Sequence, residues 1–249
     1  MRVLYQFPIS HFCEKARWNL DAKALPFVVR DVPPGLHRWL LPRGGKRKVP
    51  LLADEGFVVQ DSAAIAAYLD ERYGAPRLLP GGGEAARVLE LERYFGQIGH
   101  EVRRVAYGAM LARPGVVAEA LFAPYPLPAR ALGRAFGGRI EGVIRKQYEI
   151  TDATRASSWA ALLEGLDRIE RETGCDPGRY LVGDRLSIAD ISAAALLAPV
   201  VASPGSPYAP MIKDAGAELT ALRDSILARP AVAWIDARYA RDRQAKREG

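Results

Sequence analysis

Ser10 and Cys13 are the two N-terminal residues whose types and spacing could support sulfur chemistry. They stand three positions apart, which is the spacing of a Cys-x-x-Cys redox pair in which an oxygen replaces the first sulfur. Because the segment has no second thiol, it cannot form a local disulfide and would have to use the sulfur of another molecule. A free thiol has a pKa of about 8.5, and a hydroxyl that donates at a helix N-terminus favours the thiolate. Ser10 is therefore a candidate for activating a bound thiol without being a nucleophile itself.

The neighbouring residues predict a strand that leads into a helix. An apolar run at residues 3–5 favours a strand, and Ser10 suits the N-cap of a helix that begins near His11. A plain helix cap needs the same residue type as an activating hydroxyl, so both interpretations of Ser10 stay open. Cys13 lies one turn into the helix, where it is either a small buried hydrophobe or an exposed thiol near the helix dipole.

The first part of the chain predicts a small α/β domain at residues 1–76. A second strand, a two-stranded hairpin and a helix that Gly74 ends are expected at residues 27–32, 51–53, 57–59 and 62–73. Depending on how residues 35–45 fold, the order of elements is β-α-β-β-β-α or β-α-β-α-β-β-α.

A Pro- and Gly-rich linker at residues 77–83 leads to an all-helical domain at residues 84–249. Strand signals disappear there, and the apolar residues keep helical spacing. The many Pro and Gly residues at 113–138 predict an irregular apolar segment that could shape a pocket. Ser187 and Asp190 form a capping box for a helix that is apolar nearly all round, which we expect at the buried centre of this domain.

The composition is that of an ordinary globular protein. With 249 residues, 49% hydrophobic and 26% charged, the chain can bury a sizeable core, and it has no apolar run long enough to span a bilayer. Two distant cysteines and three histidines predict no metal site. The net charge of +6 is mostly dispersed, and the basic block at residues 38–48 suits a small anionic ligand at least as well as nucleic acid. We therefore expect a cytoplasmic protein with neither nucleic acid nor membrane as partner.

Four motifs resemble, in order, those of the soluble glutathione transferase family. Ser10–Arg17 is similar to Ser/Cys-Pro-Phe-x-x-Lys-Val-Arg, Lys48-Val49-Pro50 to Gly-x-Val-Pro, Asp61–Ile65 to Glu-Ser-x-Ala-Ile, and Gly183–Asp190 to Gly-Asp-x-x-Ser/Thr-x-Ala-Asp. The resemblance covers nearly the whole chain, and it implies a thioredoxin-like N-terminal domain, an all-α C-terminal domain and a homodimer. Two positions depart from the family pattern: His11 replaces a Pro, and Asp61 replaces a Glu.

The resemblance implies that glutathione binds as a co-substrate. Pro50 would be a cis proline that turns the backbone N–H and C=O of Val49 toward the cysteinyl part of glutathione. The Ser62 hydroxyl and N–H would bind the γ-glutamyl carboxylate and Asp61 its amine, although both residues also suit a plain N-cap. Lys48 is a candidate for the glycine carboxylate, or simply part of a solvated face.

Three functions remain open from the sequence. The first is a glutathione transferase, with a role in detoxification, in which Ser10 stabilises the thiolate for attack on an apolar electrophile. The second is a glutathione-dependent thiol reductase, isomerase or dehalogenase that uses Cys13, and the third is a non-catalytic binding protein with the same fold. Arg17 and Asp190 are interpreted as structural. Candidate contacts to the electrophile, which core packing would explain equally for the apolar ones, are Tyr94, Arg103, Tyr107 and Met110.

Overall fold

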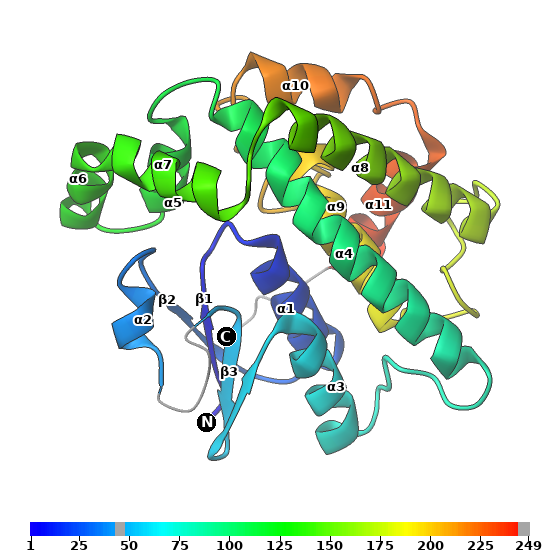
Figure 1. Cartoon of the computed structure of the whole chain (residues 1–249). Helices are drawn as coiled ribbons and strands as arrows, with labels where there is room; N and C mark the ends of the chain where they lie inside the picture. The colour runs from blue at the N-terminus through cyan, green and yellow to red at the C-terminus, as the bar shows by residue number, and fades with distance from the viewer. Residues whose placement is uncertain (43–47, 244–249) are drawn as a thin grey trace.

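The computed structural model describes residues 1–42 and 48–243 of the chain. Residues 43–47 of the predicted basic block therefore lie outside the described part. A small sheet with its helices forms the N-terminal part, and helices alone follow it (Figure 1). None of the helices in the described ranges is both long enough and apolar enough to cross a bilayer.

The N-terminal part is a four-stranded mixed sheet in the order β2-β1-β3-β4. β1 runs parallel to β2 and antiparallel to β3, and β3 and β4 form the predicted hairpin. The elements follow in the order β-α-β-α-β-β-α, which is the second of the two predicted orders, and the expected fold class is confirmed. Their bounds are β1 Val3–Gln6, α1 His11–Ala22, β2 Val28–Asp31, α2 His37–Leu40, β3 Leu51–Asp54, β4 Phe57–Gln60 and α3 Ser62–Tyr73.

The alternation of the strands gives the sheet two apolar faces. Leu4 and Leu52 are cross-strand partners on one face, where they pack with Ala16 of α1 and Ile65 of α3. Leu51, the next residue along β3, points to the other face and joins a second cluster beside α2. Helices α1 and α3 thus cover one face together, so their N-termini are held by the same core.

The remaining helices build the second part of the molecule. α9 forms its centre, and all of its residues are buried, as predicted from its apolar sequence. The capping box of Ser187 and Asp190 at its start is also confirmed. The bounds are α4 Glu84–Met110, α5 Val116–Phe122, α6 Leu127–Ala135, α7 Gly137–Gln147, α8 Asp152–Thr173, α9 Ile188–Val201, α10 Ala217–Asp224 and α11 Pro230–Arg241.

The segment predicted to be irregular at residues 113–138 is instead mostly helical. Gly115, with φ +88°, caps the start of α5, and Pro128 lies in the first turn of α6. Both residue types are compatible with helix starts, because a first-turn Pro loses no intrahelical hydrogen bond. The Pro and Gly residues therefore divide this segment into short helices rather than prevent helices from forming.

Helix α1 joins the two parts by packing against α4 and α9. Lys15 of α1 and Glu92 of α4 form a buried ion pair across this junction. A Cβ atom on Gly99 would lie 3.1 Å from the Phe12 ring and 3.1 Å from the Leu196 Cδ1 methyl. Because glycine has no side chain, it lets α1 and α9 approach α4 closely. The junction fixes the start of α1 against the middle of α4.

Candidate ligand-binding site

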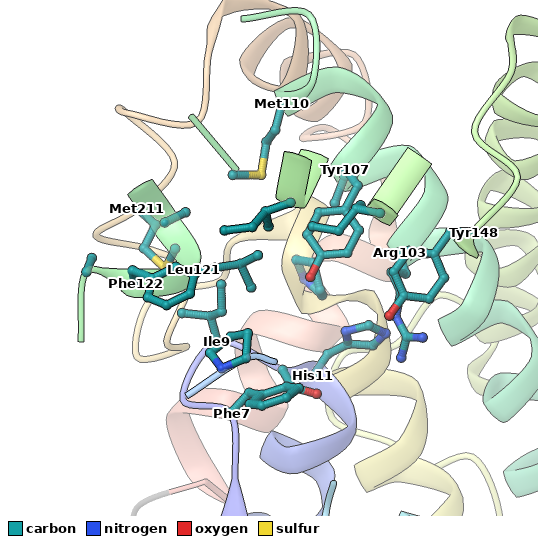
Figure 2. Close-up of a pocket in the computed structure, with 18 of the residues that line it drawn as sticks. Phe7, Ile9, His11, Arg103, Tyr107, Met110, Leu121, Phe122, Tyr148 and Met211 are labelled. Carbon is teal, nitrogen blue, oxygen red and sulfur yellow. The ribbon is translucent and has the colours of Figure 1, made fainter. Parts of the chain in front are cut away.

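A pocket of about 1670 Å³ lies where the sheet part meets the helices (Figure 2). Its wall has two regions with different origins. The first, which we call the motif end, comprises Ser10, Lys48–Pro50 and Asp61. The second, the helical end, consists of residues from α4, α5 and α7 with Tyr148 after them; its members include Arg103, Tyr107, Met110, Leu121, Phe122 and Tyr148.

Ser10 is the N-cap of α1, as predicted, and it also lines the pocket. Its Oγ accepts the backbone N–H of Cys13 at 3.4 Å, a long and weak cap bond. Because a hydroxyl can accept and donate at once, the two interpretations of Ser10 do not exclude each other.

Cys13 has no exposed surface. Burial raises the pKa of its thiol, although the Ser10 hydroxyl and the charge of Arg17 act in the opposite direction. A thiol that stays protonated and shielded from solvent is a poor nucleophile. The condition for the reductase hypothesis, an exposed Cys13 near the helix dipole, is therefore not met, and Cys13 packs as a small buried hydrophobe.

The Val49–Pro50 peptide bond is cis, as the resemblance implied. It lies directly before β3, and both residues line the pocket together with the exposed Lys48. The backbone oxygen of Lys48 accepts a hydrogen bond from the Gln60 side chain. This contact fixes the backbone of the motif end while the Lys48 ammonium stays in solvent.

Asp61 is the N-cap of α3. Its Oδ1 accepts the N–H of Ala63 at 2.8 Å and of Ala64 at 3.4 Å, and its own N–H donates to the oxygen of Pro50 at 3.2 Å. Its φ of +84° is unusual for a residue with a side chain, and such backbone strain concentrates at functional sites. Ser62 is 2% exposed and is not among the described residues that line the pocket. In the described ranges, neither Asp61 Oδ2 nor the Ser62 hydroxyl has a hydrogen-bond partner.

Tyr107 and Met110 lie on the pocket wall where α4 ends. Tyr107 stacks on Tyr148, with ring centroids 5.7 Å apart, and burial raises the pKa of its hydroxyl to about 12. The hydroxyl is therefore protonated near neutral pH and can donate a hydrogen bond. Tyr94, also expected here, lies elsewhere: its ring packs under the guanidinium of Arg168, outside the pocket.

Arg103 projects from α4 beside Tyr148, on the side of the pocket away from Phe122 and Met211 (Figure 2). Its guanidinium carbon lies 4.9 Å from the ring centroid of Phe12 and 4.9 Å from that of Tyr148. Two aromatic faces thus hold the cation in place.

His11 lines the same region but is itself buried. Its Nε2 lies 2.8 Å from the carbonyl oxygen of Gly99. Burial, reinforced by the charge of Arg103, holds the pKa of His11 well below its ordinary value. The imidazole is therefore neutral, and it carries its proton on Nε2, which donates to the carbonyl.

Arg17 and Asp190 have structural partners. Arg17 pairs with Glu14 at 2.7 Å, and Arg243 pairs with the same carboxylate. Although burial opposes them, these two guanidiniums hold the pKa of Glu14 below its ordinary value. Asp190 accepts hydrogen bonds from the N–H and hydroxyl of Ser187, and burial raises its pKa to about 6. Both contact sets support the structural interpretation.

Two family models match the chain. The N-terminal domain of glutathione S-transferases matches residues 4–77, and the C-terminal domain of glutathione S-transferases matches residues 152–237. The chain belongs to the glutathione S-transferase family. The matched ranges leave out residues 78–151, which contain α4 to α7 and hence most of the helical end.

Solved glutathione S-transferases share the fold at low sequence identity. One from Ceriporiopsis subvermispora, in complex with glutathione, is 18% identical with a TM-score of 0.61, over 100% of this chain and 98% of that one. One from Rhodospirillum rubrum F11 is 22% identical with a TM-score of 0.55, over 93% and 90%. The β-etherase LigF from Sphingobium sp. strain SYK-6 is 20% identical with a TM-score of 0.60, over 94% and 98%. No curated protein sequence matches the chain.

The transferase fold brings most of the predicted residues to one pocket. Ser10, Lys48, Val49, Pro50, Asp61, Arg103, Tyr107 and Met110 line it, whereas Cys13 and Ser62 are buried and are not among the described lining residues. No pattern in the sequence predicted that Phe12 or the residues of α7 line the pocket. For the residues of α5, the signal was the apolar composition of the 113–138 segment.

Proposed function

We propose that this protein transfers glutathione to an apolar electrophile and that the Ser10 hydroxyl stabilises the glutathione thiolate. The observation that carries the proposal is the position of Ser10, which lies on the pocket wall at the N-terminus of α1, where its Oγ makes only a long cap bond of 3.4 Å to the backbone in the described part of the chain. A donated hydrogen bond and the positive end of the helix dipole both lower the pKa of a nearby thiol. The chain thereby supplies what a weakly acidic thiol needs at neutral pH.

The motif end supplies groups of the types that glutathione requires. The backbone of Val49 is the proposed partner of its cysteinyl part, and Lys48 of its glycine carboxylate. The free Asp61 Oδ2 suits the γ-glutamyl ammonium, and the Ser62 hydroxyl with the N-terminus of α3 suits the γ-glutamyl carboxylate. A relative of the same fold was solved in complex with glutathione, which supports the choice of ligand.

In the proposed reaction, the sulfur atom of glutathione is the nucleophile. The thiolate forms a bond to an electrophilic carbon held at the helical end, the leaving group departs with the electron pair of the bond that breaks, and the thiol proton passes to solvent. The protein contributes positioning and a lowered thiol pKa. We also propose, as the family resemblance implies, a cytoplasmic homodimer with a role in detoxification; sedimentation of the purified protein tests the dimer.

Calorimetric titration with glutathione tests the proposal, together with the ultraviolet absorbance of the bound thiolate. Wild type should bind, and Ser62→Ala should weaken binding by about tenfold or more through loss of a hydrogen bond to a charged group. Ser10→Ala should still bind glutathione but should lose the thiolate absorbance at neutral pH and most of the turnover of a chloronitrobenzene. An S-alkylated glutathione, which has no thiol, should bind both Ser10 forms equally.

The alternatives give different outcomes in the same experiment. If Cys13→Ser abolished turnover while Ser10→Ala kept it, the reductase hypothesis would replace this one. Absence of glutathione binding at millimolar concentration would leave the non-catalytic binding protein. The buried thiol of Cys13 argues for retained activity in Cys13→Ser.

A further inference from the structure

Arg103 and Arg104 are adjacent on α4, but their partners differ. Arg104 donates to both carboxylate oxygens of Glu101 at 2.7 Å and to the backbone oxygen of Tyr148 at 2.9 Å. Arg103 has neither an ion pair nor a hydrogen bond with any residue that the structure describes. Its neighbour is therefore a structural cation, whereas Arg103 is a half-buried cation without an acceptor. None of its guanidinium nitrogens is a fully buried atom without a partner, so its N–H groups reach the pocket and are available to a ligand there.

The two rings beside Arg103 determine which of its atoms are available. Phe12 and Tyr148 contact it as cation–π partners, with the guanidinium carbon 4.9 Å from each ring centroid, and these contacts leave its N–H groups without a carboxylate or carbonyl acceptor among the described residues. The N–H donors lie at the edge, in a fork that matches the two oxygens of a carboxylate. The contacts also fix the side chain before a ligand arrives, so little conformational entropy remains to be lost on binding.

The charge of the pocket wall favours an anion. The described residues that line it include eight Lys or Arg and three Asp or Glu. None of the three acidic residues forms an ion pair with Arg103. Asp61 caps α3, Glu119 lies 3.8 Å from Arg134, and Asp214 lies on the segment before α10. His11 and His100 stay neutral because burial and Arg103 lower their pKa values, so they add no competing charge.

The part of the pocket wall away from Arg103 is largely apolar. Tyr107 and Met110 lie further along α4, and Leu121 and Phe122 face them across the pocket (Figure 2). A ligand that fills this space and reaches Arg103 must have an apolar or aromatic body and a planar negative group. We propose that the second substrate is an apolar electrophile bearing a carboxylate and that the Arg103 guanidinium receives this carboxylate. This inference rests on the proposed function and names the substrate class of the same pocket.

A matched pair of electrophiles separates charge from shape. A chlorodinitrobenzoate and its uncharged methyl ester react alike: the glutathione sulfur bonds to the ring carbon, chloride leaves with the bonding electron pair, and the thiol proton goes to solvent. Arg103→Met removes the charge and keeps an apolar stem between the rings. We expect it to lower kcat/KM for the benzoate by about tenfold or more, as for loss of a charge-assisted hydrogen bond, with far less effect on the ester.

Two further variants control this measurement. Arg103→Lys keeps the charge without the planar fork and should recover part of the benzoate preference. Arg93→Met removes an exposed arginine of α4 that donates a hydrogen bond to the backbone oxygen of Leu89, and it should change kcat/KM for neither substrate. Equal losses for benzoate and ester in Arg103→Met would overturn the proposal, and so would weaker binding of glutathione itself, because Arg103 would then belong to the glutathione site.

Binding of an unreactive dinitrobenzoate, measured by calorimetry, makes the outcome independent of turnover. Wild type should bind it with or without glutathione present, and Arg103→Met should bind it at least about tenfold more weakly. If glutathione fails to bind wild type while the dinitrobenzoate binds through Arg103, the proposed function fails and the carboxylate site stands. If glutathione binds and the dinitrobenzoate affinity does not depend on Arg103, this inference alone fails.

Discussion

The two ends of the pocket are built in different ways. The motif end consists of helix starts and a strand start held by the sheet core, and it presents a hydroxyl, a carboxylate and backbone groups. The helical end consists of side chains from long and short helices, and it presents aromatic rings, thioether and guanidinium groups. Backbone-based sites suit a ligand that never changes, whereas a side-chain wall can change with each substitution. This difference predicts that a single substitution should change binding at one end of the pocket and not at the other, except at the junction of α1 and α4, which positions both ends.

The largest effect is expected at that junction. Glu92→Gln would leave the Lys15 ammonium, 1% exposed, without its carboxylate between α1 and α4. Breaking a buried ion pair by removing one partner costs about 3–5 kcal/mol of unfolding free energy. Urea unfolding measures this loss, and binding at both ends should weaken together because α1 begins at Ser10 of the motif end and α4 carries Arg103, Tyr107 and Met110 of the helical end.

A surface pair and a double variant serve as controls for this prediction. Glu55→Gln removes the partner of Arg72 at an exposed site and should cost less than about 1 kcal/mol. Replacing the buried pair by Lys15→Met with Glu92→Leu should recover most of the stability, since neither charge is then left unpaired. A loss in Glu92→Gln no larger than in Glu55→Gln would show that the junction does not depend on this pair.

A smaller effect should be confined to the helical end. Gly133 lies under the ring of Phe122, and a Cβ atom there would be 2.6 Å from the Cγ of that ring. Gly133→Ala should therefore displace Phe122 and raise KM for a bulky aromatic electrophile several-fold, while glutathione affinity stays unchanged. Gly142→Ala is the matched control, because a Cβ on that residue of α7 meets no atom within 4 Å. A fall in glutathione affinity in Gly133→Ala alone would show that the two ends are coupled.

The same contrast explains what the sequence could predict. Ser10, Gly74 and the Ser187–Asp190 box mark helix ends through local chemistry, so they predicted the helices that begin or end there. The helical end depends on how α5 to α7 pack against α4, and no short-range pattern specifies such contacts. The Pro and Gly residues of that segment suggested irregular chain because their role as helix boundaries depends on the register of the helices they separate.

Phe12 and Cys13 also show what the sequence could not predict. Phe12 has the helical spacing of Ala16 and Leu20, which predicts that the three share one face, but the start of α1 extends past the sheet core and Phe12 meets α4 instead. Cys13 allowed two interpretations because its exposure depends on elements more than a hundred residues away. Spacing identifies a face of a helix, and only the tertiary fold decides what covers that face.

At neutral pH the smallest effect is that of His11, where the two ends meet. Burial first, and then the charge of Arg103, lowers the pKa of this imidazole well below its ordinary value, and His100 on α4 adds to the shift. The unfolded state, in which the pKa is about 6.5, then binds the proton more readily than the folded state. Stability attributable to His11 is therefore full above that pH and declines as the pH falls below it, by at most about 1.4 kcal/mol per pH unit.

Urea unfolding of wild type and His11→Asn between pH 7 and pH 5 measures this dependence. The Asn amide can still donate to the Gly99 carbonyl but does not titrate, so the variant should lose less stability on acidification than wild type. Parallel pH profiles would mean that His11 is protonated in the folded protein as easily as in the unfolded chain, which the burial between α1 and α4 opposes. A variant with a flatter profile and unchanged glutathione affinity would show that the imidazole supports the junction rather than the motif end.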